Sequence, residues 1–140
     1  PIHVYIRYKI EKEIFKNKIY FKDIKNLWNE SYLNNLSINL NSETEGVLQD
    51  IHWYEGIFGY FPTYALGAMI ASQIKFNCPL FDIFLGNPNE ENINNLIIWL
   101  NTNIHQKASL YSSDEMLQSI SGENLNPKYY LDHLVDRFIQ

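Results

Sequence analysis

The chain has 140 residues, a length that suits a single domain, residues 1–140, with a buried core. Its content of 46% hydrophobic and 15% aromatic residues excludes a disordered chain and a flexible linker. The formal net charge is −5, and the lysines that crowd the first 25 residues are interleaved with acidic residues, which favours a solvated helix face and no nucleic-acid partner.

The cellular compartment can be predicted from the apolar runs and the cysteine count. No apolar run approaches the roughly 18 residues of a membrane span, so we expect no membrane partner. The single cysteine, Cys78, cannot form an internal disulfide, which favours a structural thiol in a cytoplasmic protein. The chain begins at Pro1 without a methionine, as expected of a processed start or of a piece of something longer.

The first 36 residues predict two amphipathic helices. Isoleucine recurs every four residues from Ile2 to Ile14, which places an apolar stripe on the first helix. The second helix follows Asp23. Its inner face is expected to carry Ile24, Leu27, Trp28, Tyr32 and Leu36. Residues 37–46 are polar and aperiodic, which indicates a connecting loop.

A third helix is predicted to begin at Pro62, because proline suits the first helical position. Residues 64–71 carry no charge on any face. We therefore expect this helix to be buried on all sides.

Three more helices are predicted in the last third of the chain. Asn89 is a candidate cap for a helix with apolar residues spaced by three and four. Ser112 and Glu115 form a capping box for the next helix, which Gly122 can end. Asn126-Pro127 begins the last helix. No run alternates with period two for long, so the fold class is all-α, a compact bundle of about six or seven helices.

Common catalytic motifs are absent from the sequence. The four histidines, His3, His52, His105 and His133, are far apart, and none belongs to a His-Glu-x-x-His pair. A metal site assembled across different helices is the alternative, and no feature of the sequence supports it. Glycine-rich phosphate loops and Gly-x-Ser-x-Gly elbows are also absent.

One segment, residues 46–64, concentrates glycines, aromatic residues, a carboxylate and a histidine. Asp50 and His52 would point apart on a helix but share a face in an extended stretch, where the carboxylate could fix the imidazole tautomer. On chemistry alone, a glycine-rich turn packed by aromatic rings, with His52 in the core, is the favoured alternative.

The motifs in this segment, Gly46-x-x-Gln49-Asp50-x-His52-Trp53 and Gly59-Tyr60-Phe61-Pro62-Thr63-Tyr64, resemble the thermostable (Taq-type) carboxypeptidase family of zinc metallopeptidases. The resemblance extends upstream to His3-Val4-x-Ile6-Arg7-x-x-x-Glu11. Downstream it includes Gly122-Glu123-x-Leu125-Asn126-Pro127. It covers essentially the whole chain and corresponds to the final third, or somewhat less, of a complete member.

The resemblance implies a larger helical metallopeptidase fold in which a zinc-bound water frees the C-terminal residue of a peptide substrate. The family's metal ligands belong to a His-Glu-x-x-His motif that this chain lacks. Zinc is therefore expected in the complete family enzyme and none on this chain.

The resemblance also assigns candidate roles to residues of this chain. His52 would donate to the oxyanion or carry a proton, and Tyr64, or with less support Tyr60, would offer a phenolic donor. The substrate-binding candidates are Gln49, Asp50, Arg7 and Trp53. For Arg7, a helix-surface position or an ion pair with Glu11 is the favoured alternative. We assign His3, His105 and His133 to no chemistry.

Two hypotheses about function follow. The first is a C-terminal portion of a zinc carboxypeptidase that is inactive alone, because the metal supplies most of the rate enhancement. The second is a catalytically dead helical module that binds a protein partner. Apolar faces around Trp53, Phe58 and Phe61 are expected to be uncovered, which predicts a homo-oligomer, most simply a dimer.

Overall fold

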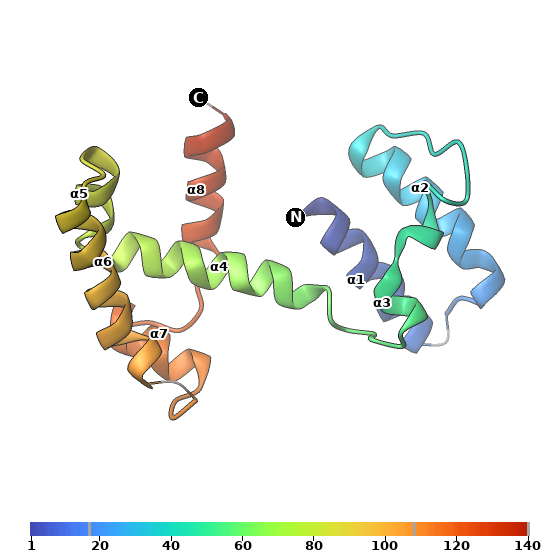
Figure 1. Cartoon of the computed structure of the whole chain (residues 1–140). Helices are drawn as coiled ribbons and strands as arrows, with labels where there is room; N and C mark the ends of the chain where they lie inside the picture. The colour runs from blue at the N-terminus through green and yellow to red at the C-terminus, as the bar shows by residue number, and fades with distance from the viewer. Residues whose placement is uncertain (17, 108, 140) are drawn as a thin grey trace. The chain divides into compact units, whose positions relative to one another are not determined.

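The computed structural model describes residues 1–16, 18–107 and 109–139. All regular structure in these residues is helical (Figure 1). The α-helices are α1 (Ile2–Phe15), α2 (Ile24–Leu36), α3 (Ile51–Tyr54), α4 (Pro62–Asn77), α5 (Phe81–Gly86), α6 (Glu90–Asn103), α7 (Ser113–Ser121) and α8 (Lys128–Phe138). The predicted all-α class is confirmed; the two shortest helices, α3 and α5, were not predicted.

The contacts within the chain divide it into two compact units, Pro1–Leu66 and Gly67–Gln140. Helix α4 begins in the first unit and continues into the second. Each unit is described below by itself. The prediction that residues 1–140 form one domain stays a prediction.

The core of the first unit lies between α1 and α2, which pack side by side. Ile6 and Ile10 of α1 meet Ile24 and Trp28 of α2 in one buried cluster. The apolar stripe predicted for α1 therefore faces the core at these two positions, whereas Ile2 at its start is exposed. Burial of these large side chains is the main favourable term that holds the two helices together.

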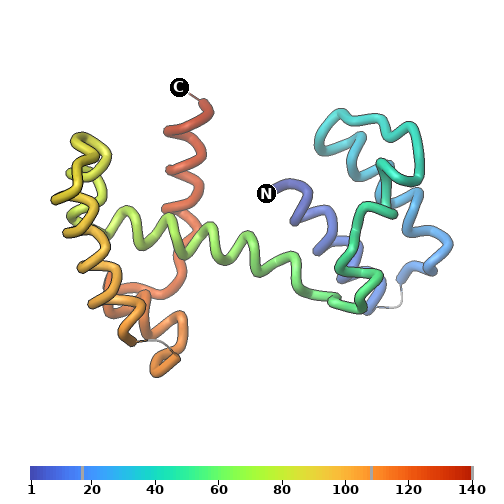
Figure 2. Tube along the Cα trace, in the orientation of Figure 1, coloured from blue at the N-terminus to red at the C-terminus, as the bar shows by residue number. Residues whose placement is uncertain are grey.

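The segment after α2 leads back over this core. Helix α2 ends at Ser37, the only described non-glycine residue with a left-handed backbone, and the loop predicted over residues 37–46 follows (Figure 2). A short 3₁₀ helix, Val47–Gln49, then brings the chain to the single turn of α3. Val47 and Trp53 pack partly on the α1–α2 core, so the motif segment is attached to the best-packed region of the unit.

Helix α4 begins at Pro62, as predicted, but it is not buried on all sides. Its buried residues are Ser72 and Gln73, whereas Tyr64, Leu66 and Phe76 are exposed. The expectation of complete burial is wrong, because the described neighbours of this helix cover only part of its surface.

The second unit confirms the predicted helix ends. The Asn89 side chain accepts a hydrogen bond from the Asn92 amide at 2.9 Å at the start of α6. Ser112 and Glu115 form the capping box of α7, and Gly122 ends that helix with φ +76°. At α8, the Asn126 side chain accepts from the Lys128 amide at 3.0 Å. Each device satisfies backbone groups that a helix end leaves unpaired.

The buried side chain of Gln73 organises the connection between α7 and α8. Its amide nitrogen donates to the Ser121 hydroxyl at 2.7 Å and to the Asn124 carbonyl at 3.1 Å. Its oxygen accepts from the Asn126 amide at 2.9 Å. Cys78, at the end of α4, is buried and unpaired, in agreement with a structural thiol.

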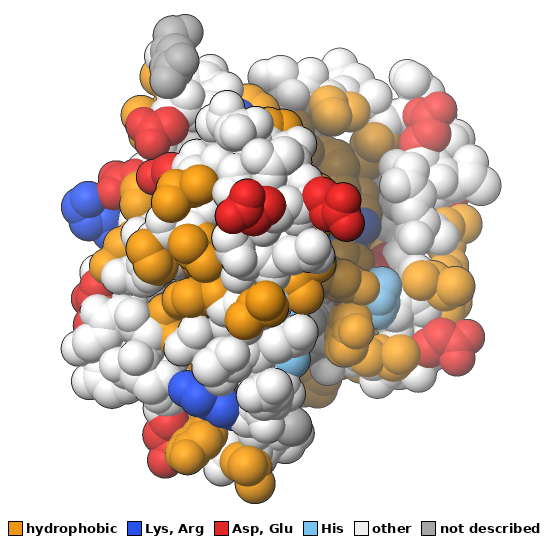
Figure 3. Space-filling model, turned by 60° about the vertical axis from the view of Figure 1, so that its left-hand side comes forward, with side chains coloured by type: hydrophobic (Ala, Val, Ile, Leu, Met, Phe, Trp, Pro, Cys, Tyr) orange, Lys and Arg blue, Asp and Glu red, His pale blue; other side chains and the backbone are white. Residues whose placement is uncertain are grey.

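Large apolar side chains remain on the surface of the second unit. Figure 3 shows hydrophobic side chains gathered on the face toward the viewer. Exposed residues of α5 and α6 include Ile83, Leu85, Ile93, Ile97 and Ile98. None of the helices in the described ranges has the length and apolarity to cross a bilayer.

Candidate functional site

The candidate site is built on one face of α1. His3, Arg7 and Glu11 follow one another at intervals of four residues, so their side chains leave the helix in one direction. Arg7 and Glu11 are both buried, at 6% and 4% exposure. Charged residues are seldom buried to this degree without partners. The burial of Arg7 and of Glu11 is therefore explained by the polar groups that each side chain contacts.

The Arg7 guanidinium is paired with the Asp50 carboxylate. Arg7 Nε donates to Asp50 Oδ2 at 2.6 Å, and Asp50 is only 1% exposed. The guanidinium carbon also lies 4.5 Å from the centre of the Trp28 ring and 4.4 Å from that of Phe61. The charge is thus held between two aromatic faces, where cation–π attraction adds to the ion pair.

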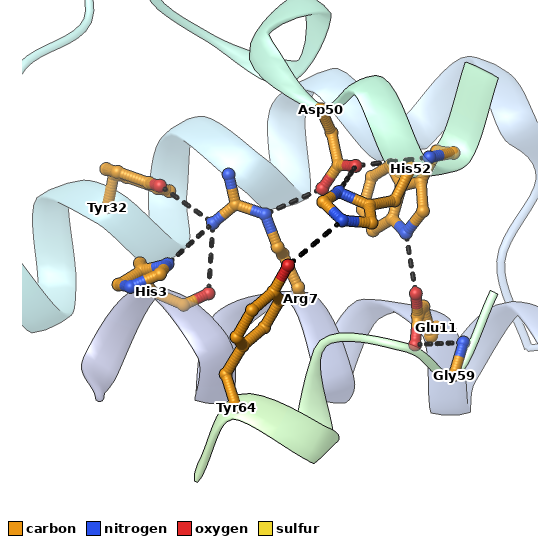
Figure 4. A network of polar contacts seen from close by, with 9 residues as sticks. His3, Arg7, Glu11, Tyr32, Asp50, His52, Gly59 and Tyr64 are labelled. Atoms are coloured by element: carbon orange, nitrogen blue, oxygen red, sulfur yellow. Dashed lines mark hydrogen bonds and ion pairs between the residues drawn. The ribbon is translucent and has the colours of Figure 1, made fainter. Parts of the chain in front are cut away.

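The remaining contacts of Arg7 run to the other side of its side chain (Figure 4). Arg7 Nη1 donates to the His3 carbonyl at 3.1 Å and to the Tyr32 hydroxyl at 3.3 Å, and it lies 3.3 Å from His3 Nδ1. Burial, then the Arg7 charge, then the chain's amino terminus lower the pKa of His3. A neutral His3 can accept the Arg7 hydrogen bond at Nδ1, and an imidazolium cannot.

Asp50 connects this ion pair to the motif segment. It is the N-cap of α3, and its Oδ1 accepts from the Trp53 amide at 3.1 Å while Oδ2 faces Arg7. Its backbone is extended, and His52 lies within the helical turn that follows. The two residues therefore lie neither both in a helix nor both in an extended stretch, which were the two patterns considered from the sequence. Asp50 is extended and caps the helical turn that contains His52.

The capping geometry brings the His52 ring close to the same carboxylate. His52 Nδ1 lies 3.8 Å from Asp50 Oδ1, too far for a hydrogen bond but close enough for charge interaction. This buried nitrogen has no hydrogen-bond partner among the described residues. The Asp50 carboxylate is thus the charged group beside this nitrogen.

The other ring nitrogen of His52 points toward the α4 start. His52 Nε2 lies 3.4 Å from the Tyr64 hydroxyl, and Tyr64 is 51% exposed (Figure 4). The Tyr60 ring stacks on the imidazole at a centroid distance of 5.3 Å, and the Phe61 ring meets it edge-on at 4.6 Å. An imidazole and a phenol therefore lie together at the surface, above a buried ion pair.

The second carboxylate of α1 holds the turn after α3. Glu11 Oε1 accepts from the Trp53 indole nitrogen at 2.6 Å, and Oε2 accepts from the Gly59 amide at 3.1 Å. Gly59 has φ +77°, a left-handed conformation that favours glycine. The predicted alternative of a surface Arg7 paired with Glu11 is wrong, because the two side chains are buried with different partners.

A family model described as Carboxypeptidase Taq (M32) metallopeptidase matches residues 1–138. The chain belongs to this family. Carboxypeptidase 1 of Bacillus subtilis is 38% identical over 142 residues, which cover 99% of this chain and 28% of that protein. Thermostable carboxypeptidase 1 of Pyrococcus furiosus is 31% identical over 98% of this chain and 28% of its own length.

A solved structure of a relative has the same fold. Trypanosoma cruzi metallocarboxypeptidase 1 matches with a TM-score of 0.89 at 36% identity, over 100% of this chain and 29% of that one. The M32 chain described here therefore spans less than a third of the length of the relatives it matches. The resemblance that its motifs indicated is confirmed.

A metal centre does not fit the side chains of this M32 chain. Across the described ranges, no three His, Cys, Asp or Glu residues lie close enough to hold a metal ion. His52, the histidine of the motif, is surrounded by Asp50 and aromatic rings.

The structure brings most of the predicted site residues together. Arg7, Asp50, His52, Tyr60 and Tyr64 form one connected group. Trp53 packs edge-on against Trp28 and lines an apolar groove of about 250 Å³ beside Asp50. Gln49 is exposed on the 3₁₀ helix before Asp50, and none of the described hydrogen bonds involves its side chain.

Sequence reasoning missed the parts played by His3, Tyr32 and Glu11. The spacing of four between His3, Arg7 and Glu11 was a signal that the three share a helix face. Tyr32 carried no such signal, because its contact with Arg7 joins residues 25 positions apart.

The buried ion pair gives a first testable prediction. Arg7→Met leaves the Asp50 carboxylate buried without its cation, and we expect the free energy of unfolding to fall by about 3–5 kcal/mol. The double variant Arg7→Met, Asp50→Asn should lose less than the sum of the two single losses, because neither charge then remains unpaired. Urea unfolding followed by helical circular dichroism measures all three values.

The control is the exposed ion pair between Glu13 and Lys18, whose charged atoms lie 3.7 Å apart. Glu13→Gln should change the free energy of unfolding by less than about 1 kcal/mol. Strictly additive losses for the Arg7 and Asp50 variants would show that the two side chains are not coupled.

Proposed function

We propose that this chain forms the C-terminal part of a zinc metallocarboxypeptidase that releases C-terminal amino acids from peptides. The observation that carries the proposal is the Asp50–His52–Tyr64 group, which lies on the motif segment and is fixed from below by Arg7. The chain spans about 28% of its curated relatives, so the proposal concerns the activity of a longer enzyme to which it contributes this part.

Hydrolysis of the last peptide bond adds water to the carbonyl carbon, and the amide nitrogen leaves with a proton. We assign His52 Nε2 to the donation of a hydrogen bond to the oxyanion, or to transfer of the proton to the leaving nitrogen. Asp50 orients the ring through Nδ1. The Tyr64 hydroxyl, with Tyr60 as the alternative, supplies a second donor. The exposure of Tyr64 and Tyr60 supports these roles, since substrate can reach both.

The proposed substrate-binding residues divide by exposure. Gln49 is exposed and can meet the substrate backbone directly. Trp53 can contribute through its ring, because Glu11 already accepts from its indole nitrogen. Arg7 and Asp50 are buried, so we propose that they act on substrate through the position of His52.

The catalytic metal is proposed to lie outside this chain's own side chains. In the complete family enzyme we expect zinc on the His-Glu-x-x-His motif and a later glutamate, and that motif does not occur in the sequence. Oxyanion donors supply about 10²–10³-fold each, and they act on a reaction that the metal makes possible. We therefore propose that the chain alone binds no zinc and is inactive.

We further propose a cytoplasmic protein that assembles as a dimer. A single buried free cysteine supports a reducing compartment. The exposed apolar side chains support self-association, although Phe61, expected on the uncovered face, is buried against Arg7. The alternative of a dead interaction module is not favoured, because the family match includes the motif segment in full.

Inactivity of the chain alone is tested with short peptides in the presence of zinc or cobalt. We expect no release of C-terminal residues above the uncatalysed rate, measured by mass spectrometry of the products. Steady release that a chelator abolishes would contradict the proposal.

The roles of His52 and Tyr64 are tested in a chimera in which this chain replaces the matching part of carboxypeptidase 1 of Bacillus subtilis. We expect the chimera to release C-terminal residues. His52→Ala should lower kcat by about 10²–10³-fold, and Tyr64→Phe by about tenfold, because each removes a donor to the reacting group.

Tyr54→Phe is the matched control, because Tyr54 is exposed on the same short helix as His52. It should leave kcat unchanged. An active chimera in which the His52 and Tyr64 variants also keep full kcat would reject the assigned roles.

The oligomeric state is tested by light scattering on the purified chain. We expect a mass of two chains, because burial of the exposed apolar faces favours association. A single-chain mass that persists at high concentration would exclude the dimer.

A further inference from the structure

We propose that Glu11 is a positioning residue that fixes the His52 ring by closing the turn on which the ring's neighbours lie. This inference deepens the proposed function and rests on it for its catalytic consequence. The key observation is that one buried carboxylate of α1 reaches both ends of residues 53–59.

The two contacts of Glu11 lie at the beginning and the end of the segment that follows His52. Trp53, which donates its indole N–H at 2.6 Å, directly follows His52. Gly59, which donates its backbone N–H at 3.1 Å, directly precedes Tyr60 and Phe61. The rings of Tyr60 and Phe61 are the stacked and edge-on neighbours of His52. Glu11 thus joins the helical turn that carries the imidazole to the residues that hold it in place.

The chemistry of Glu11 points to positioning and not to packing alone. A buried carboxylate loses its hydration, and an apolar side chain of similar size would pack without that cost. What a carboxylate adds is direction, since its two oxygens accept from two fixed N–H groups at once. The turn also packs through its own rings, since Phe58 stacks on Trp53 at a centroid distance of 6.4 Å and meets Phe15 edge-on at 5.5 Å. The Ile57 amide donates to the His52 carbonyl at 2.8 Å, and Glu11 adds the side-chain hydrogen bonds that tie Trp53 and Gly59 to α1.

Asp50 and Glu11 contact different parts of the segment that carries His52. Asp50 holds the start of α3 through the Trp53 amide and faces His52 Nδ1. Glu11 holds the end of the turn and determines where the Tyr60 and Phe61 rings meet the imidazole. Displacement of a catalytic group by about 1 Å can lower a rate by about 10²-fold, so loss of this closure has a measurable consequence.

The test compares Glu11→Gln with Glu13→Gln in the chain itself. Glutamine keeps the size of the side chain but turns one acceptor into a donor, so it cannot accept from both Trp53 and Gly59. Nuclear magnetic resonance measures the His52 ring protons, which the Tyr60 ring should shift upfield, and the exchange rate of the Gly59 amide proton. In Glu11→Gln we expect a smaller upfield shift and faster Gly59 exchange, with neither change in Glu13→Gln.

The result that would overturn the inference is a folded Glu11→Gln chain with unchanged His52 shifts and unchanged Gly59 exchange. If Glu11→Gln unfolds the chain, Trp53→Phe decides instead, because it removes only the indole donor and keeps an aromatic ring. Trp53→Phe should also reduce the His52 shift, whereas Trp99→Phe in α6 should not. Unchanged shifts in Trp53→Phe would then reject the inference.

The same variant in the chimera separates this inference from the proposed function. Glu11→Gln should lower kcat by about 10-fold to 10²-fold, with a smaller change in KM, because the histidine is displaced while the substrate contacts remain. An inactive parent chimera would refute the proposed function and leave the resonance test of Glu11 valid. An active chimera whose kcat is insensitive to Glu11→Gln would refute the positioning role.

Discussion

The ion pair between Arg7 and Asp50 is the constraint on which the rest of the first unit depends. It joins α1 to the start of α3, two segments separated by 43 positions in the chain. Both side chains are buried, and the guanidinium lies over the rings of Trp28 and Phe61. Because an unpaired buried charge is costly, any rearrangement that separates the pair is strongly disfavoured. The motif segment is therefore held in one position on α1.

Two carboxylates with different partners hold the residues around His52. Asp50 forms an ion pair with Arg7 and caps α3. Glu11 instead accepts hydrogen bonds from neutral N–H groups of Trp53 and Gly59. The polar groups lie beneath the imidazole and the aromatic rings lie around it. Such a supporting layer limits the movement of a catalytic side chain without contacting the substrate.

The M32 chain combines a well-packed motif region with widely exposed apolar helices. Ile6, Ile10, Ile24 and Trp28 form a tight core under the site. Helices α4, α5 and α6 keep large apolar side chains at the surface. A helix without charges, such as the first half of α4, is typical of the interior of a larger protein. The share of about 28% that this chain covers of its relatives agrees with that composition.

The sequence by itself determined the all-α class, the capped starts of α6 and α7, and the family. Capping groups such as Asn89 and Ser112, and the stripe of Ile6 and Ile10, act within a few residues, so local spacing reveals them. The motif of residues 46–64 identified the family in the same way. Only the tertiary structure decided that Arg7 pairs with Asp50 and that Glu11 holds Trp53 and Gly59, because these contacts join residues more than 40 positions apart. The packing of α1 against α2 and α3 creates those contacts, and no local pattern encodes which buried charge meets which partner.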